Sequence, residues 1–199
     1  ILLWIMNPHR LPFKSWKQEL TFAAAGLTGM TLYYLMENIA LTYSQASNVG
    51  VIVSIAPVFT AITAHIFLKE EGKLRPAFFM GCVIALIGIS LISFSGTTMH
   101  LNPIGDLLSV GGAIIWSFYS VLSKKIGSFG YSVVQATRRT FFYGILFMIP
   151  ALFIFDFKWD LTRFATPAYL FNIFYLGLGA SAICFVTWNM AVRILGAIK

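Results

Sequence analysis

Charged side chains are scarce in this chain. Only 11% of its 199 residues are Asp, Glu, Lys or Arg, whereas 58% are hydrophobic, and the mean hydropathy is +0.81. A soluble domain carries about 25% charged residues, so most of the surface of this chain does not face water. Lipid tails accept exposed aliphatic and aromatic side chains without penalty. The composition therefore excludes a soluble globular domain and predicts an integral membrane protein.

Metal-binding and catalytic patterns are also missing. The two cysteines, Cys82 and Cys184, lie in apolar runs without metal-type spacing. The histidines are far apart in the chain, and no metalloprotease, serine-hydrolase or nucleotide-binding motif occurs. Ser181 lies in a predicted helix, but no histidine on a neighbouring span is an obvious base for it. We therefore predict no catalytic residue, no metal and no cofactor, and interpret the chain as a non-enzyme.

The chain lacks an initiator methionine and a basic segment before its first apolar residues. Residues 1–6 are all apolar, yet six residues cannot cross a hydrocarbon core that requires about 20. We interpret this segment as the end of a helix whose beginning is absent. The sequence is then expected to be a fragment, and not a protein with a signal peptide.

Six apolar runs of spanning length are present, separated by short polar connections. Backbone polar groups must be satisfied within hydrocarbon, so each run is predicted to be a helix. Because the connections are short, successive helices are expected to be antiparallel neighbours. The runs are residues 20–40, 46–68, 76–97, 104–123, 132–156 and 168–191. The predicted fold is an all-α, multi-pass transmembrane helix bundle.

The basic residues are distributed unevenly between the two ends of these helices. Ten of the 14 lie in connections on one side, whereas the other side has only Lys158 and Arg163, close to Asp156 and Asp160. This positive-inside pattern predicts that the basic side faces the cytoplasm. A net charge of +7 confined to short loops does not indicate nucleic-acid binding. The ten residues are Arg10, Lys14, Lys17, Lys69, Lys73, Arg75, Lys124, Lys125, Arg193 and Lys199.

Two of the predicted helices resemble each other at an offset of 151 residues. The matched pairs are Gly26 and Gly177, Leu27 and Leu178, Tyr34 and Phe185, Asn38 and Asn189, Ala40 and Ala191, and Ala46 and Ala197. The two helices are five spans apart, so they must cross the membrane in opposite directions. Inverted repeats of this kind build many transporters, in which two halves rock about a site near the midplane.

Four stretches of the sequence carry motifs of a known family. They are Tyr33–Leu41 with Tyr43–Asn48, the proline-containing Ser54–Ala61, Glu70 and Glu71 with the glycine-spaced Gly81–Gly88, and Gly105-Asp106 with Trp116–Tyr119. In this order and spacing they resemble the third to sixth helices of the EamA-type transporters of the drug/metabolite transporter superfamily. The resemblance covers nearly the whole chain.

The resemblance implies ten helices in two inverted halves of five. By that match, residues 1–98 form a partial first EamA-type repeat that lacks its first helix and most of the second. Residues 99–199 form a partial second repeat that lacks its last two helices. The expected fold is therefore an inverted-repeat drug/metabolite transporter fold, truncated at both ends. The family's central cavity is lined by six helices, four of which are expected in this chain.

Polar and aromatic positions inside the apolar runs are candidates for the substrate cavity. A carboxylate is costly in hydrocarbon, so Glu37 either binds a cationic group, or exchanges a proton, or lies in water at the outer mouth. Asn38 and Asn189 either line the cavity or hydrogen-bond across a packed helix contact. Trp116, with Ser120 close to its face, either stacks on a substrate or packs in the core.

Further candidates lie on the polar faces of the two repeated helices, where Tyr34 and Tyr175 recur at helical spacing. Pro57 removes a backbone donor and is either a hinge or a tolerated kink. Arg139, with the arginine before it, is interpreted as snorkelling to lipid phosphate. The predicted cavity residues are Tyr34, Glu37, Asn38, Ser54, Trp116, Ser120, Tyr175 and Asn189.

These observations predict a secondary transporter that moves small, amino-acid-like or drug-like metabolites across the cell membrane by alternating access. Its expected partners are the lipid bilayer, a small-molecule substrate and, as a candidate coupling ion, the proton. No nucleic acid is expected, and the sequence leaves the oligomeric state open. The alternative is a non-transporting membrane sensor or scaffold, which predicts no continuous water-accessible cavity between Asn38 and Asn189.

Overall fold

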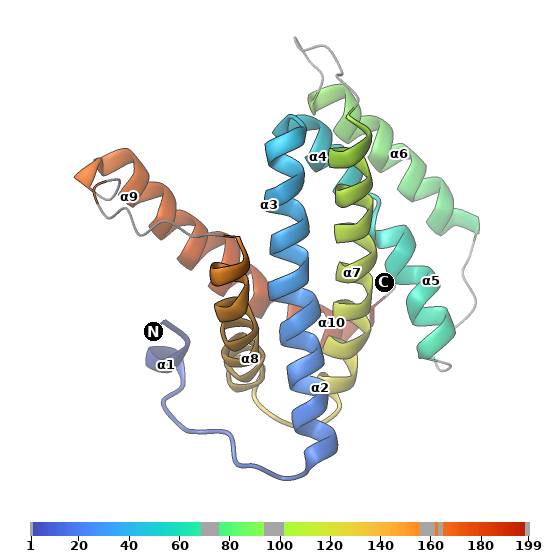
Figure 1. The fold of residues 1–199 in the computed structure, drawn as a ribbon. Coiled ribbons are helices and arrows are strands. Elements are labelled where there is room, and N and C mark those ends of the chain that lie inside the picture. The colour runs from blue at the N-terminus through green and yellow to red at the C-terminus, as the bar shows by residue number, and fades with distance from the viewer. Residues whose placement is uncertain (1, 69–75, 94–101, 156–161, 163–164, 198–199) are drawn as a thin grey trace.

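A computed structural model describes residues 2–68, 76–93, 102–155, 162 and 165–197, in which helices predominate (Figure 1). The chain begins with the short helix α1 (Leu2–Met6) and a long helix made of α2 (Trp16–Gly26), the π-helical segment η1 (Leu27–Leu32) and α3 (Tyr33–Tyr43). Next come α4 (Ala46–Val53), α5 (Ala56–Phe67), α6 (Pro76–Ser93), α7 (Pro103–Gly127) and α8 (Val133–Ile154). The last long helix consists of α9 (Pro167–Phe174), the π-helical segment η3 (Tyr175–Ile183) and α10 (Cys184–Leu195).

All six predicted apolar runs form helices over most of their described residues, and residues 94–97 and 156 lie outside the described part. Four helical segments are long and apolar enough to cross a membrane: Ala46–Phe67, Pro103–Gly127, Val133–Ile154 and Pro167–Leu195. The helix from Trp16 to Tyr43 is not among these four. The all-α, multi-pass membrane fold predicted from the sequence is thus confirmed. Among the residues used in the sequence analysis, Ile1, His100, residues 69–75 and 156–160, Arg163 and Lys199 also lie outside the described part.

Local sequence explains where two of the long helices begin. Ser15 precedes α2, and its Oγ accepts a hydrogen bond from the backbone N–H of Gln18 at 3.3 Å. Asn102 precedes α7 in the same way, and its Oδ1 accepts from the N–H groups of Ile104 and Gly105 at 3.1 and 3.3 Å. Such caps satisfy N–H groups that have no partner within the helix.

Helix α7 lies at the centre of the bundle and packs against α2, α3, α4, α5 and α10. Helix α8 packs against α2 and η1, where small residues let the backbones approach closely. A Cβ atom added to Gly26 would lie 2.6 Å from the backbone nitrogen of Gly144, and one added to Gly144 would lie 2.7 Å from the Cβ of Met30, so both glycines are needed at this contact. Thr31 reinforces the contact by donating a hydrogen bond to the carbonyl of Gly144 at 3.0 Å.

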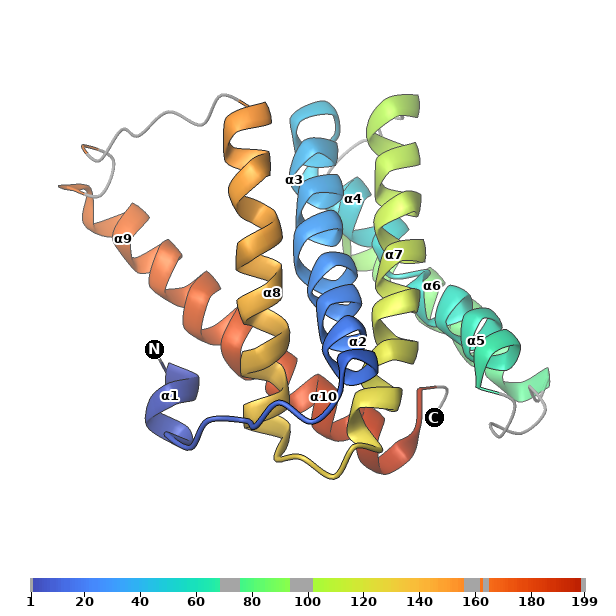
Figure 2. The same cartoon turned by 60° about the horizontal axis from the view of Figure 1, so that its bottom comes forward.

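The two helices predicted to be repeats share their backbone features as well as their residues. Trp16 and Pro167, which begin the two helices, are separated by the same offset of 151 residues. Leu32 and Ile183, which end the two π-helical segments, are separated by that offset too. Figure 2 shows the helix α2–α3 running upward and the helix α9–α10 running downward. The two helices therefore cross in opposite directions, as the inverted repeat requires.

The second predicted apolar run, residues 46–68, is interrupted between α4 and α5. Helix α4 ends at Val53, α5 begins at Ala56, and Pro57 occupies the first turn of α5. The proline ring would clash with the carbonyl four residues earlier, which belongs to Val53. The interruption therefore lies on the N-terminal side of Pro57, where short i to i−3 hydrogen bonds replace the α-helical ones.

Candidate functional site

An aromatic cluster lies where α3, α7 and α10 meet. We define it as Tyr33 and Tyr34 on α3, Trp116 and Tyr119 on α7, and Phe185 and Trp188 on α10. Trp116 is at its centre, because its ring centroid lies 4.9 Å from that of Tyr33, 5.5 Å from that of Phe185 and 5.6 Å from that of Trp188. Two predicted cavity residues, Tyr34 and Trp116, are thus brought together with rings that the candidate set did not include.

The cluster spans the crossing of the two repeated helices. Tyr34 and Phe185 occupy equivalent positions in the repeat, and their ring centroids are 6.4 Å apart. The hydroxyl groups of Tyr34 and Ser181 also hydrogen-bond each other at 3.1 Å. The cluster therefore lies where equivalent positions of these two similar, oppositely directed helices meet.

Glu37 lies one helical turn beyond Tyr33 on α3. Its side chain is half-buried, and the Tyr33 side chain is its electrostatic neighbour one turn earlier. Tyr33 also contacts Trp116 and so connects the carboxylate to the aromatic cluster. An acidic group beside several aromatic faces is suited to a cation, which both the carboxylate and the ring quadrupoles attract.

Asn189 is held inside a polar network that joins three helices. Its Oδ1 accepts hydrogen bonds from the Tyr119 hydroxyl at 2.7 Å and from the Ser123 hydroxyl at 2.6 Å, both on α7. Its Nδ2 donates to Thr137 Oγ1 on α8 at 2.9 Å. The cavity beside it has a volume of about 20 Å³, which holds about one water molecule. In this conformation Asn189 therefore occupies a packed helix contact.

The remaining predicted cavity residues lie elsewhere. Asn38 is exposed, and its Nδ2 donates to the backbone carbonyl of Tyr34 in the same helix at 2.7 Å. Tyr175 is 64% exposed and stacks on Phe171 of its own helix. The structure therefore does not bring Asn38 and Tyr175 together with the aromatic cluster.

Two serines of the predicted set bond to their own helices. Ser120 is fully buried and donates to the carbonyl of Trp116 at 3.0 Å, and Ser54 donates to the carbonyl of Val51 beside the α4–α5 interruption. Pro57 is exposed at that interruption. Ser120 therefore supports the helix that carries Trp116 and does not present its hydroxyl to a ligand.

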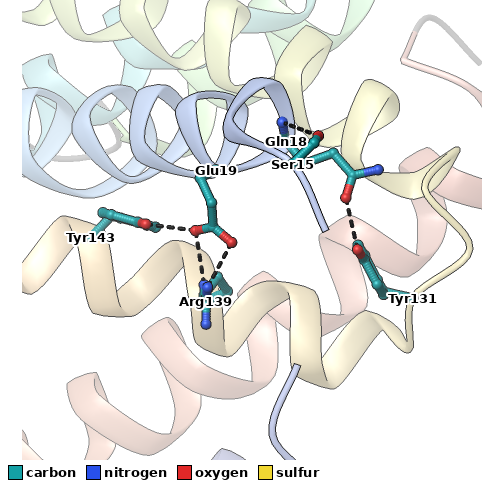
Figure 3. Close-up of polar contacts among 6 residues, drawn as sticks. All are labelled: Ser15, Gln18, Glu19, Tyr131, Arg139 and Tyr143. Carbon is teal, nitrogen blue, oxygen red and sulfur yellow. Dashed lines mark hydrogen bonds and ion pairs between the residues drawn. The ribbon is translucent and has the colours of Figure 1, made fainter. Parts of the chain in front are cut away.

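A second polar site was not predicted from the sequence (Figure 3). We call it the basic-end clamp, because it lies at the end of the bundle that carries Lys14, Lys17, Lys124 and Arg193. Its core is Glu19 of α2, which accepts hydrogen bonds from Arg139 at 2.6 and 3.1 Å and from the Tyr143 hydroxyl at 2.6 Å, both on α8. The Tyr131 hydroxyl donates to Gln18 at 2.7 Å and completes the clamp.

The clamp corrects the interpretation of Arg139 as a side chain that reaches out to lipid phosphate. Its guanidinium group lies against Glu19, whose side chain is only 6% exposed. A buried carboxylate is costly unless a charged partner offsets its desolvation, and the pair satisfies both groups. The only signal in the sequence was one charged residue near the start of each of two apolar runs, and this signal does not reveal that Glu19 and Arg139 meet. Within the described residues, no group of three His, Cys, Asp or Glu side chains is placed to hold a metal ion.

Comparisons with known proteins agree with this architecture. The model of the EamA-like transporter family matches residues 1–94 and 103–199. An uncharacterized transporter of Archaeoglobus fulgidus is 25% identical over 96% of this chain and 65% of its own length. The uncharacterized transporter YvbV of Bacillus subtilis is 26% identical over 90% of this chain and 58% of its own length. A probable terminal-alkyne amino-acid exporter of Streptantibioticus cattleyicolor is 26% identical over 85% of this chain and 55% of its own length.

A solved crystal structure shares the fold, with a TM-score of 0.67 and 22% identity over 92% of this chain and 63% of that chain. The chain thus spans less than two thirds of the length of each of these relatives. The family matches include both repeated helices and all residues of the aromatic cluster and the clamp. The chain is a multi-pass α-helical membrane protein and belongs to the EamA-like transporter family.

Proposed function

We propose that the full protein is a secondary transporter that carries small metabolites across the cell membrane by alternating access. The observation that carries this proposal is the contact between Tyr34 and Phe185, where two oppositely directed, repeat-equivalent helices cross. Transporters with inverted repeats bind their substrates at such a repeat interface near the midplane. The aromatic cluster supplies apolar faces at this position, and Glu37 supplies a charge.

The proposed substrates are amino-acid-like or drug-like solutes. The carboxylate of Glu37 would attract an ammonium or other cationic group, while Trp116 and Trp188 would contact the apolar part of the solute. One relative is named a probable amino-acid exporter, which supports the same class of solute. Glu37 is also the residue that we propose for proton exchange, because ionisable groups inside spans commonly serve in proton relays.

Alternating access requires that one end of the bundle be closed while the other is open. The basic-end clamp joins α2 to α8, that is, a helix of the first predicted repeat to a helix of the second. We propose that the basic end faces the cytoplasm and that this conformation is closed there. Opening that end then requires Glu19 to separate from Arg139 and Tyr143.

The test is transport by the full-length gene product in proteoliposomes. Uptake of labelled amino acids and organic cations is measured with and without a pH gradient. Glu37→Gln is expected to lower uptake about tenfold, the effect of losing one hydrogen bond to a charged group. Asn38→Gln is the matched control, because the neighbouring amide is exposed and bonds to its own helix.

Two outcomes contradict the proposal. Uptake that is insensitive both to the pH gradient and to Glu37→Gln would exclude a coupling role for Glu37. Absence of flux for every solute, together with no reaction of cysteines placed at positions 38 and 189 with water-soluble reagents, would favour a sensor or scaffold.

A further inference from the structure

A pocket of about 210 Å³ lies at the basic end, on the face of α8 that carries Arg138. It is formed by α1, by the segment between α1 and α2, and by α8, so it is separate from the aromatic cluster. Its lining is Trp4, Arg10, Leu11, Gln135, Arg138, Arg139 and Phe142. Three arginines and three large apolar side chains therefore surround a single opening.

Two of the three arginines that line this pocket are not paired with a carboxylate among the described residues. Arg139 is paired with Glu19. The guanidinium carbons of Arg138 and Arg10 lie 4.1 and 5.8 Å from the centroid of the same Trp4 ring, so two positive charges lie close to one indole. Among the described residues, the Glu19–Arg139 pair is the one ion pair found, and it leaves these two cations without a carboxylate partner. Like charges held this close favour an anion between them.

Arg138 is fixed at the pocket by the protein backbone. Its guanidinium group donates hydrogen bonds to the carbonyls of Asn7 and His9. Gln135, one turn earlier on α8, also donates to Asn7 Oδ1 and to the His9 carbonyl. A guanidinium group has five N–H donors, so donors remain for a ligand after these two bonds. The charge is therefore positioned before any ligand arrives.

The apolar lining indicates what kind of anion fits. Phe142 lies one turn further along α8, away from the basic end, and is 61% exposed, and Trp4 is 44% exposed. Indole rings are enriched at the level of lipid headgroups. A free phosphate ion would use the guanidinium groups alone, whereas a phospholipid would also cover the aromatic surface with its chain.

We propose that this pocket binds the phosphate group of an acidic phospholipid. Arginine forms paired hydrogen bonds with phosphate oxygens, and basic pockets between membrane helices are suited to anionic headgroups. The headgroup lies against Arg10 and Arg138, and the acyl chain follows the exposed face of Phe142 into the bilayer. The proposal does not depend on which solute the protein transports.

The test is native mass spectrometry of the purified full-length protein in detergent containing equal amounts of phosphatidylglycerol and phosphatidylcholine. Wild type is expected to retain phosphatidylglycerol at least fivefold more than phosphatidylcholine. Arg10→Gln is expected to lower this preference about fivefold, the usual contribution of one basic residue at an anionic membrane surface. Lys125→Gln is the matched control, because Lys125 is exposed at the same end but does not line the pocket.

Arg138→Gln is expected to have at least the effect of Arg10→Gln, but it also removes the bonds to Asn7 and His9. Arg10→Gln leaves those bonds in place and is the decisive variant. Equal retention of the two lipids by wild type overturns the proposal, as does an unchanged preference in Arg10→Gln. Displacement of phosphatidylglycerol by inorganic phosphate at the same concentration would identify a free-anion site and also overturn it.

Discussion

Tyr119 is enclosed on all sides near the crossing of the repeated helices. Its side chain is only 1% exposed, and its hydroxyl donates to Asn189. Its ring lies so close to Gly29 that a Cβ atom on Gly29 would be 2.3 Å from the ring carbon Cδ2. The absence of a side chain at position 29 is therefore what admits the ring.

Gly29→Ala is expected to destabilise the protein by about 1–3 kcal/mol, the usual cost of overpacking a core. The buried ring cannot move aside, because Asn189 and Phe185 hold it. Thermal unfolding of the purified protein in detergent measures the effect. Gly50→Ala is the control, since no described atom lies within 4 Å of the Cβ position there, and alanine raises helix propensity. Equal melting temperatures for the two variants would show that the Tyr119 ring adapts.

Asn189→Leu is expected to cost about 1–3 kcal/mol, because the buried hydroxyl of Tyr119 loses its acceptor and leucine cannot replace it. Asn38→Leu provides the control from the equivalent position of the repeat, where the amide is exposed. The free energy of unfolding of both variants, measured in urea or by heating, shows whether the amide at position 189 contributes more to stability than the exposed amide at position 38. A smaller loss for Asn189→Leu than for Asn38→Leu would contradict the assignment of Asn189 to a packed contact.

At the scale of the helix, the sequence was sufficient to predict that the helices exist. It was not sufficient to predict where they depart from regular α-helical hydrogen bonding. Long apolar runs have only one way to satisfy their backbone in lipid, so the six helices follow from composition alone. The π-helical segments η1 and η3 do not, because a shift in hydrogen-bond register depends on how neighbouring helices pack. Their equivalent positions in the repeat were visible only once the backbone was known.

The interruption between α4 and α5 was predicted from the sequence only in part. Pro57 predicted a local loss of hydrogen bonds, and the interruption does precede it. The sequence could not give the direction in which α5 leaves α4, because that depends on the packing of both helices against α7.

Pro57→Ala is expected to restore a backbone donor and an α-helical bond to the carbonyl of Val53. If the interruption acts as a hinge, the variant becomes more stable to heat while its transport rate falls several-fold. Melting temperature and initial uptake rate are measured on the same preparation. Pro76→Ala is the control, because Pro76 is the first residue of α6 and the N–H group of a first helical residue has no acceptor within its own helix. An unchanged rate in a more stable Pro57→Ala protein would identify a tolerated kink.

At the scale of the whole molecule, the sequence identified candidates on single helices but could not pair them between helices. Glu19 and Arg139 are 120 residues apart, and nothing in either apolar run indicates that they meet. The offset of 151 residues correctly related Tyr34 to Phe185, which are in contact, but Asn38 and Asn189 do not meet in this conformation. The similarity between two helices can be detected in the sequence. The tilt of one helix against the other, which decides which equivalent residues touch, cannot.

The basic-end clamp gives the final prediction, because it joins two helices that separate in the alternating-access cycle that we propose. Ala25, further along α2 than Glu19, is fully buried in the core of the bundle, so a cysteine at this position, in a variant whose Cys82 and Cys184 are replaced by serine, reports opening of the basic end. Glu19→Gln and Arg139→Gln are each expected to raise its reaction rate with a water-soluble maleimide several-fold, because each removes hydrogen bonds between charged groups worth about 1.5–3 kcal/mol. The double variant is expected to react no faster than either single variant, since both break the same pair.

Lys17→Gln removes an exposed charge from the same turn of α2 and is the control. If the single variants react no faster than Lys17→Gln, the clamp does not control access to this end. If the effects of the two single variants instead add in the double variant, Glu19 and Arg139 act on separate partners, and the ion pair is not what keeps the halves together. A coupled increase, confined to the Glu19 and Arg139 variants, is expected if one buried charge pair holds the first predicted repeat against the second.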